Sequence, residues 1–177
     1  DTRDACEALQ QKYAPDLVVA VERPGLTADG HLMSSRGEDI TRVSAPLDSL
    51  MRAPLTVAAG DGGNEIGMGA VAPFLDARGL VPGTSVTRAT HLLLSEVSNW
   101  GAYGLVAMLD LVAGINELPN GRTEADWIER IVDAGAGDGV SRENVAMVDG
   151  HSLEVNAQVL AQLSKLVSGL RRKAKST

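Results

Sequence analysis

The chain has 177 residues, 44% of them hydrophobic and 22% charged, which is long enough for a single domain with a hydrophobic core. Its formal net charge of −7 argues against a nucleic-acid partner, because a field of that sign repels the phosphate backbone. An inserted membrane helix is also excluded, since the sequence has no run of about twenty apolar residues. We therefore expect residues 1–177 to form one domain.

The first half of the chain alternates between apolar runs and polar connections. Residues 3–13 carry apolar side chains at helical spacing, so we expect a helix there. The run Leu-Val-Val-Ala-Val at 17–21 predicts a strand that is buried on both faces. Residues 26–46 show no periodicity and are rich in Gly, Asp, Ser and Arg, which indicates a long functional loop. A short helix is expected at 47–51.

A second buried strand is expected at 55–59, and it leads into the glycine-rich segment 60–69. Apolar side chains at helical spacing from Ile66 to Leu75 predict that a helix follows this segment. A third strand is expected at 90–94. Further helices are predicted at 103–113, 123–134 and 152–172.

This order predicts an α/β fold with a three-layer, mostly parallel sheet flanked by helices, resembling a Rossmann fold. Each predicted strand ends in a polar loop that contains glycine. Such loops meet at the carboxyl edge of a parallel sheet, where ligands bind. Because three strands are fewer than the five or so that a doubly wound sheet normally has, we expect this chain to be only the C-terminal part of the fold. The missing part would come from an upstream segment or a protein partner.

The segment Gly-Asp-Gly-Gly-Asn-Glu at 60–65 is the main candidate site. Positive φ at Gly60, Gly62 and Gly63 would let a ligand approach backbone N–H groups, and a following helix would present its amides to the same place. The carboxylates of Asp61 and Glu65 could hold a divalent cation or act as general acid and base. In the alternative interpretation, Asn64 or Asp61 caps that helix and Glu65 only favours its first turn.

Charged side chains in the two other N-terminal loops could bind the ligand, and Glu22, directly after the first predicted strand, is one of these candidates. Arg23 and Arg36 suit a bidentate grip on a carboxylate. Alternatively, Arg23 pairs with Glu22 or another loop carboxylate, and Arg36 is a solvated loop charge. Asp29 could contact the ligand or serve only as a turn residue.

Ser98, Asn99 and Trp100 follow the third predicted strand and would form another wall of the pocket. Asn99 could face a ligand or cap the next helix, and Trp100 could contribute packing alone.

Several motifs together resemble the D-glutamate cyclase family, whose members include the C-terminal domain of a vertebrate mitochondrial protein. The resemblance extends from about residue 17 to the final helix. It rests on the segments VERPG, DGH, RGEDI, GDGGNEIGMG, SNWGAYGL, DAGAGDGV and VDGHSLE.

This resemblance implies an α/β enzyme of the lyase class that closes D-glutamate to 5-oxo-D-proline with loss of water. Members of the family normally carry a further N-terminal segment with an acidic Glu-Thr-Asp-Gly-Pro type motif, which is absent from residues 1–177. The alternatives are a non-catalytic cyclase-like module within a larger assembly, and a hydrolase or lyase of another small acidic substrate.

For the cyclase reaction, we expect Glu65 or Asp61 to act as base toward the amine and the other to assist the departing oxygen. The N–H groups of Gly62 and Gly63, with Asn64, would stabilise the oxyanion. No cofactor is assigned, although a divalent cation is possible. The single cysteine is compatible with a reducing compartment, either the cytoplasm or the mitochondrial matrix.

Overall fold

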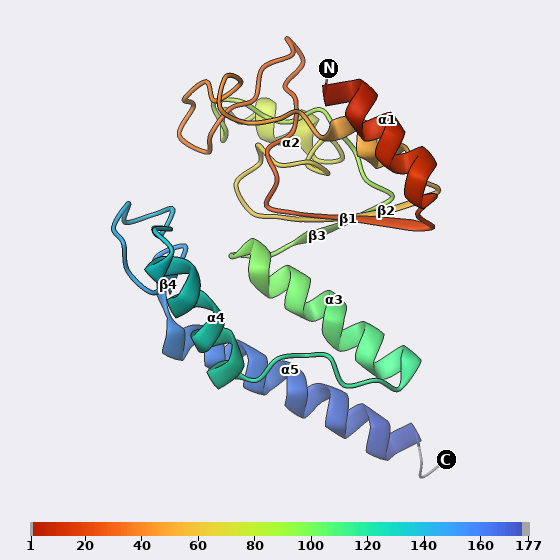
Figure 1. Ribbon diagram of the computed structural model, residues 1–177, viewed down its shortest axis with the longest axis vertical. Coiled ribbons are helices and arrows are strands. Elements are labelled where there is room, and N and C mark those ends of the chain that lie inside the picture. The colour runs from red at the N-terminus through yellow and green to blue at the C-terminus, as the bar shows by residue number, and fades with distance from the viewer. Residues whose placement is uncertain (1, 175–177) are drawn as a thin grey trace. The chain divides into compact units, whose positions relative to one another are not determined.

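A computed structural model describes residues 2–174 (Figure 1). The chain divides into two compact units, residues 1–101 and residues 102–177. We describe each unit by itself. Whether the two form one domain, as the sequence predicts, stays a prediction.

The first unit is built on a parallel sheet of three strands, β1 (Leu17–Val21), β2 (Leu55–Gly60) and β3 (His91–Leu94), in the order β1-β2-β3. Val19 is paired with Val57, and Val57 with His91, so β2 is the central strand. The predicted strands and the α/β class are confirmed. The closer likeness to a Rossmann fold stays a prediction.

The core of this unit lies along β2 rather than β1. Val57, Ala58 and Ala59 are at most 6% exposed, because β2 has a neighbouring strand on each side. On β1, Val19 and Val21 are 43% and 40% exposed. The prediction that β1 is buried on both faces is therefore wrong, since β1 lies at the edge of the sheet among the described residues.

Two short helices and one longer helix accompany this sheet: α1 (Thr2–Tyr13), η1 (Asp48–Arg52) and α2 (Ala72–Asp76). Helix α1 buries Cys6 and is tied to η1 by the Gln10 side chain, which donates to the Leu50 carbonyl at 3.0 Å. The predicted helix after residue 66 is wrong for its first part, because helical structure begins only at Ala72.

Helix α3 (Ser98–Ala113) starts earlier than the sequence predicts. The second unit then contains α4 (Gly121–Asp133), α5 (Leu153–Ala174) and a small antiparallel pair, β4 (Met147–Val148) and β5 (His151–Ser152). Strands of two residues have no periodicity to recognise, so the sequence did not predict this pair. None of the helices in residues 2–174 is both long and apolar enough to cross a membrane.

Specific polar contacts fix the second unit. The Asn120 side chain caps α4 by accepting from the Thr123 N–H at 3.0 Å. The Arg171 guanidinium donates to the Asn116 side chain at 2.9 Å and also to the carbonyls of Asp110 and Ile115. These bonds satisfy carbonyls near the C-terminal end of α3, which would otherwise lack partners.

Glu124 is a buried acid on α4, with only 1% of its surface exposed. One carboxylate oxygen accepts from the Tyr103 hydroxyl at 2.8 Å, and the other has no hydrogen-bond partner among the described residues. Burial raises the pKa of Glu124, although the Tyr103 hydrogen bond opposes this shift.

We expect Glu124 to make the stability of the second unit depend on pH. The folded state binds the proton more tightly than the unfolded state does, so the contribution is complete below the ordinary pKa of 4.5. It is lost as the pH rises through the elevated folded pKa. In urea unfolding from pH 4 to 8, the wild type should lose stability relative to Glu124→Gln as the pH rises. A constant difference between the two proteins would contradict the prediction.

Candidate functional site

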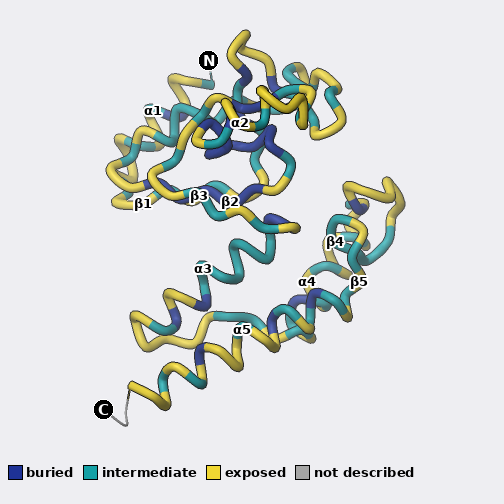
Figure 2. Tube along the Cα trace, turned by 180° about the vertical axis from the view of Figure 1, so that it is seen from behind, coloured by how far each residue is buried: buried dark blue, intermediate teal, exposed yellow. Residues whose placement is uncertain are grey.

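Apart from Gly60, which ends β2, the glycine segment 60–69 is an irregular loop that lies between two other parts of the first unit. On one side, the Gly25 N–H donates to the Asn64 carbonyl at 2.9 Å, and the Ile66 N–H donates to the Arg23 carbonyl at 2.8 Å. On the other side, the Gly67 N–H donates to the Thr87 carbonyl at 2.9 Å. Most of this segment is buried (Figure 2). Its backbone groups therefore pair with distant segments and do not form the start of a helix.

The glycines of the segment serve close packing within the protein. Of the three positions for which positive φ was predicted, only Gly63 has it, at +91°. A Cβ on Gly62 would lie 2.9 Å from oxygens of Asn64 and Glu65, and one on Gly60 would lie 2.7 Å from the Met68 side chain. The expectation of positive φ at Gly60 and Gly62 is therefore wrong, and nearby side chains leave little room for a Cβ at either position.

Glu65 organises this loop from within. Its side chain is buried, and its two carboxylate oxygens accept from the N–H groups of Gly62 and Gly63, each at 2.7 Å. Burial raises the pKa of Glu65, the loop N–H groups oppose that shift, and the nearby Asp61 charge adds to it. The two amides expected to stabilise an oxyanion thus donate to Glu65 in this structure.

In contrast to Glu65, Asp61 has an exposed side chain. One of its carboxylate oxygens accepts from both the backbone N–H and the hydroxyl of Ser98, at 2.8 and 3.0 Å. Ser98 is the first residue of α3, so the carboxylate lies at the positive end of that helix. This contact joins the loops after β2 and β3, as expected for a carboxyl edge of a parallel sheet.

Glu22 brings the loop after β1 to the same edge. It directly follows the strand, has φ of +50°, and its N–H donates to the Ala59 carbonyl at 3.0 Å. A carboxylate oxygen of Glu22 lies within 4.8 Å of one of Asp61. Two carboxylates this close can provide oxygen ligands to a divalent cation. They are therefore the residues of the first unit best placed to hold the cation considered from the sequence.

Asn64 connects the glycine segment with the long loop that precedes η1. Its side-chain N–H donates to the Met33 carbonyl at 2.9 Å. Its side-chain oxygen is buried and has no hydrogen-bond partner among the described residues. Asn64 does not cap a helix, contrary to the alternative interpretation, because no helix begins in this segment.

Arg23 lies beside this loop, but only part of its guanidinium is engaged. One terminal nitrogen donates to the Ala45 carbonyl at 2.7 Å, and the buried Nε has no partner in the described part of the chain. Arg36 is exposed, and its backbone N–H donates to the Ser34 hydroxyl at 3.3 Å. Ser35, its neighbour, lies 3.4 Å from the position that a Cβ on Gly62 would take.

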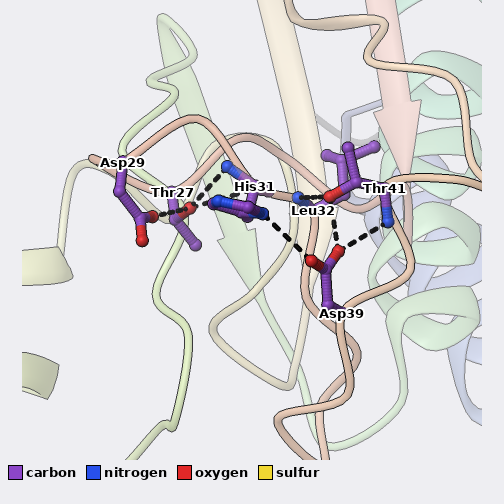
Figure 3. Close-up of polar contacts among 6 residues, drawn as sticks. All are labelled: Thr27, Asp29, His31, Leu32, Asp39 and Thr41. Atoms are coloured by element: carbon purple, nitrogen blue, oxygen red, sulfur yellow. Dashed lines mark hydrogen bonds and ion pairs between the residues drawn. The ribbon is translucent and has the colours of Figure 1, made fainter.

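Asp29 belongs to a local polar network that shapes the tip of the same loop (Figure 3). It accepts from the Thr27 hydroxyl at 2.6 Å, which lowers the pKa of Asp29. His31 pairs with Asp39 at 3.0 Å, and Asp39 accepts from the hydroxyl of Thr41 at 2.6 Å. These local contacts fit the alternative interpretation, in which Asp29 is a turn residue. A role of Asp29 in substrate binding stays a prediction.

Asn99 and Trp100 lie in the first turn of α3 and are half-buried. The Trp100 N–H donates to the Val97 carbonyl at 2.9 Å, which is a contact of the helix start. Their predicted roles toward a ligand remain predictions.

A cavity of about 590 Å³ opens beside Asp61 in the first unit. Asp61, Gly62 and Gly63 form its polar end, and the remaining lining is apolar, contributed by Met68, Val71, Phe74, Leu75, Leu80, Val81 and Leu94. Asp61 is the only charged one among the described residues of this lining, so the polar end offers a partner to an ammonium group and not to a carboxylate.

Comparison with known proteins fits this arrangement. The family model described as "D-glutamate cyclase-like, C-terminal" matches residues 2–164. The chain belongs to the D-glutamate cyclase-like C-terminal family. It is similar to the human protein named "D-glutamate cyclase, mitochondrial", with 35% identity over 103 residues. That match covers 53% of this chain and 17% of the human protein. The cyclase-like domain thus corresponds to a small part of its human relative.

One positioning residue of this cyclase-like chain was not predicted from the sequence. Asp48 accepts from the Leu26 N–H at 2.9 Å and from the hydroxyl of Thr87, and so joins the segments on either side of the glycine loop. These contacts join residues 22 and 39 positions apart in the sequence. No local pattern could have indicated them.

Proposed function

We propose that this chain is a D-glutamate cyclase-like lyase that converts D-glutamate to 5-oxo-D-proline with loss of water. The observation that supports this is the pair of exposed carboxylates, Asp61 and Glu22, at the carboxyl edge of the sheet in a chain of this family. The substrate would be a small acidic amino acid. By its relation to the human protein, the proposed location is mitochondrial, with the cytoplasm as the alternative.

The reaction forms one bond and breaks another within the same molecule. The α-amine nitrogen attacks the carbon of the side-chain carboxyl group, and a C–N bond forms as one C–O bond breaks. The ammonium group must lose two protons, and the departing oxygen of the side-chain carboxylate must gain two to leave as water. A site that folds the extended substrate so that these atoms meet removes much of the entropic barrier.

We assign the proton transfers to Asp61, with Glu22 as the neighbouring carboxylate. Asp61 is exposed, and its second carboxylate oxygen is left for the substrate amine, because the Ser98 bonds use the first. Asp61 would accept each of the two protons from the amine in turn and pass it to the departing oxygen, so that no net proton is consumed.

Glu65 and the two arginines have other roles in this proposal. Since Glu65 is buried and held by its own loop, it keeps Asp61 in position and does not contact substrate. Arg23 and Arg36 would bind the carboxylates of the substrate, because an acidic ligand needs positively charged partners. Asn64 lies in the loop beside Arg23, and its side-chain oxygen lacks a partner among the described residues.

The direct test is to incubate the full chain with D-glutamate and to follow 5-oxo-D-proline by chromatography, with and without a divalent cation. L-Glutamate and 5-oxo-D-proline serve as parallel substrates. We expect product from D-glutamate, and a rate about a hundredfold lower for Asp61→Asn, the usual loss for a removed general acid or base. Asp61→Asn keeps an oxygen that can accept from Ser98, so the start of α3 is preserved.

Asp76→Asn is the matched control, because Asp76 lies at the end of α2 and does not line this cavity. Its rate should stay within twofold of the wild type. Full activity of Asp61→Asn would remove the assigned role of Asp61. Failure of the folded wild-type chain to form any product would overturn the proposal that this polypeptide is a cyclase by itself.

A further inference from the structure

The cavity beside Asp61 is larger and more apolar than free D-glutamate requires. Its volume of about 590 Å³ falls in the range of about 300–1,000 Å³ that is usual for the pockets of drug-sized ligands. Its lining is apolar except at the end formed by Asp61, Gly62 and Gly63. A small dicarboxylate held at that end would leave most of the apolar lining without contact.

The apolar wall begins directly at the glycine loop. A Cβ on Gly63 would lie 2.6 Å from the Val81 side chain and 3.1 Å from that of Leu75. The lack of a side chain at Gly63 therefore lets these two residues reach the loop that carries Asp61. A ligand whose charged group contacts Asp61 would place its neighbouring atoms against this wall.

A carboxylate inside the cavity would have no positive partner among the described residues that line it. Arg78 contacts the lining only through Phe74: its guanidinium lies 3.7 Å from the Phe74 ring centroid and donates to the Phe74 carbonyl at 3.4 Å. Arg78 itself is not part of the lining. The chemistry of the cavity thus suits an ammonium group that pairs with Asp61 and carries an apolar substituent.

The proposed reaction brings such a group to this place. The group that departs starts on the carbon that the amine attacks, so it lies close to the amine and to Asp61. In free D-glutamate the departing group is a single oxygen, which does not fill the apolar part of the cavity. In a γ-amide the departing group is a nitrogen with a substituent, and the substituent would extend from Asp61 into the cavity.

We propose that the cavity binds the apolar substituent of a γ-amide of D-glutamate, and that such amides are better substrates than D-glutamate itself. This inference rests on the proposed function and names its substrate class. The α-amine nitrogen attacks the amide carbon, and a C–N bond forms as the C–N bond to the departing amine breaks. The substrate ammonium group loses two protons, and the departing nitrogen gains two and leaves as an ammonium ion beside Asp61.

The kinetic test compares four substrates on the full chain: the γ-benzylamide of D-glutamate, D-glutamine, γ-D-glutamyl-glycine and D-glutamate. Product 5-oxo-D-proline is measured by chromatography, and the rate without protein is subtracted. The three amides release amines of similar basicity, so differences in kcat/KM report on the cavity. We expect the kcat/KM of the benzylamide to exceed that of each other substrate at least about tenfold, because it alone places an apolar group against the wall.

Matched protein variants locate the apolar wall. Leu80→Lys places a positive charge in the lining, and should lower the preference for the benzylamide over γ-D-glutamyl-glycine at least about threefold. Leu80 is 58% exposed, so this substitution leaves the core intact. Leu9→Lys makes the same change at an exposed position on α1 outside this lining, and should leave the preference within twofold. Equal effects of the two variants would contradict the assignment to this cavity.

Binding of the departing amine can be measured without turnover. The methyl groups of Leu75, Val81 and Leu94 are followed in NMR spectra as benzylamine, benzyl alcohol or benzoate is added. We expect benzylamine to bind at least about threefold more tightly than benzyl alcohol, and benzoate to bind most weakly, because the ligand charge faces Asp61. Asp61→Asn should remove most of the advantage of benzylamine over benzyl alcohol.

The outcomes separate this inference from the proposed function. If D-glutamate yields product but the benzylamide reacts no faster than γ-D-glutamyl-glycine, the chain is a cyclase and the proposed substrate class is wrong. Equal binding of benzoate and benzylamine would also overturn the inference. If neither D-glutamate nor any amide yields product, the proposed function fails and the inference fails with it.

Discussion

Replacing Glu65 with alanine is expected to lower the free energy of unfolding of the first unit by about 3–5 kcal/mol. The substitution leaves the partly buried N–H of Gly62 and the buried N–H of Gly63 without the carboxylate oxygens that accept from them at 2.7 Å. Each unpaired buried donor costs about 1–3 kcal/mol, and the lost side chain leaves a void. Urea unfolding followed by circular dichroism, with hydrogen exchange of the β2 amides, would measure the loss.

Glu65→Gln tests the same contacts with nearly unchanged volume. The amide retains one acceptor oxygen, but its NH₂ group faces a backbone donor, so we expect about half the loss caused by alanine. Glu129→Gln, at an exposed position on α4, is the matched control and should stay within about 0.5 kcal/mol of the wild type. A Glu65→Ala chain as stable as this control would show that the buried carboxylate does not hold the loop.

Gly67→Ala should also destabilise the first unit strongly, by at least about 3 kcal/mol. Gly67 has φ of +101°, a region that other residues rarely adopt. A Cβ at this position would also overlap the Cβ of Ala58 in the central strand β2. Neither atom can move away without shifting backbone, so strain and steric overlap add.

Two other glycines separate these effects. Gly79 has φ of +58°, and a Cβ added there would meet open space, so Gly79→Ala should cost only about 1–2 kcal/mol from backbone strain. Gly104 lies in α3, also with open space, and Gly104→Ala should stabilise by about 0.5–1 kcal/mol. Thermal unfolding of the three variants would rank them. Equal effects of Gly67→Ala and Gly79→Ala would rule out the overlap with Ala58.

The sequence predicted the elements that local patterns determine. The apolar runs at 17–21 and 55–59 are strands, as β-branched and apolar side chains favour, although only the second run is buried. The loops after parallel strands meet at one edge of a sheet, and this rule correctly predicted that the loop of Asp61 lies near those of Glu22 and Ser98. These parts of the fold follow from short stretches of chain.

The prediction of a helix in the glycine segment was wrong because its apolar residues fit either a helix or a buried loop. Ile66, Val71 and Leu75 match helical spacing, and this suggested a helix. In the structure, Ile66 and Met68 are buried by pairing with the segments around Arg23 and Arg88. Positive φ at Gly63 and Gly67 is incompatible with a helix, but the sequence does not show which glycines adopt it.

The partners of the charged residues could not be predicted for a related reason. Glu65 is buried and accepts from the N–H groups of its own loop, and this burial depends on segments far away in the sequence. Its role as a base stays a prediction. The same holds for Arg23, whose contact with the Ala45 carbonyl spans 22 positions.

The long-range ties of the glycine loop also bear on the order in which the chain folds. Asn64 reaches Met33 across 31 positions, and Asp61 reaches Ser98 across 37. Each of these bonds closes a large loop, which costs chain entropy before any contact can compensate for it. The carboxylate pair at Glu22 and Asp61 should therefore take shape only after the three strands have assembled. Substitutions within this loop would then speed unfolding more than they slow folding.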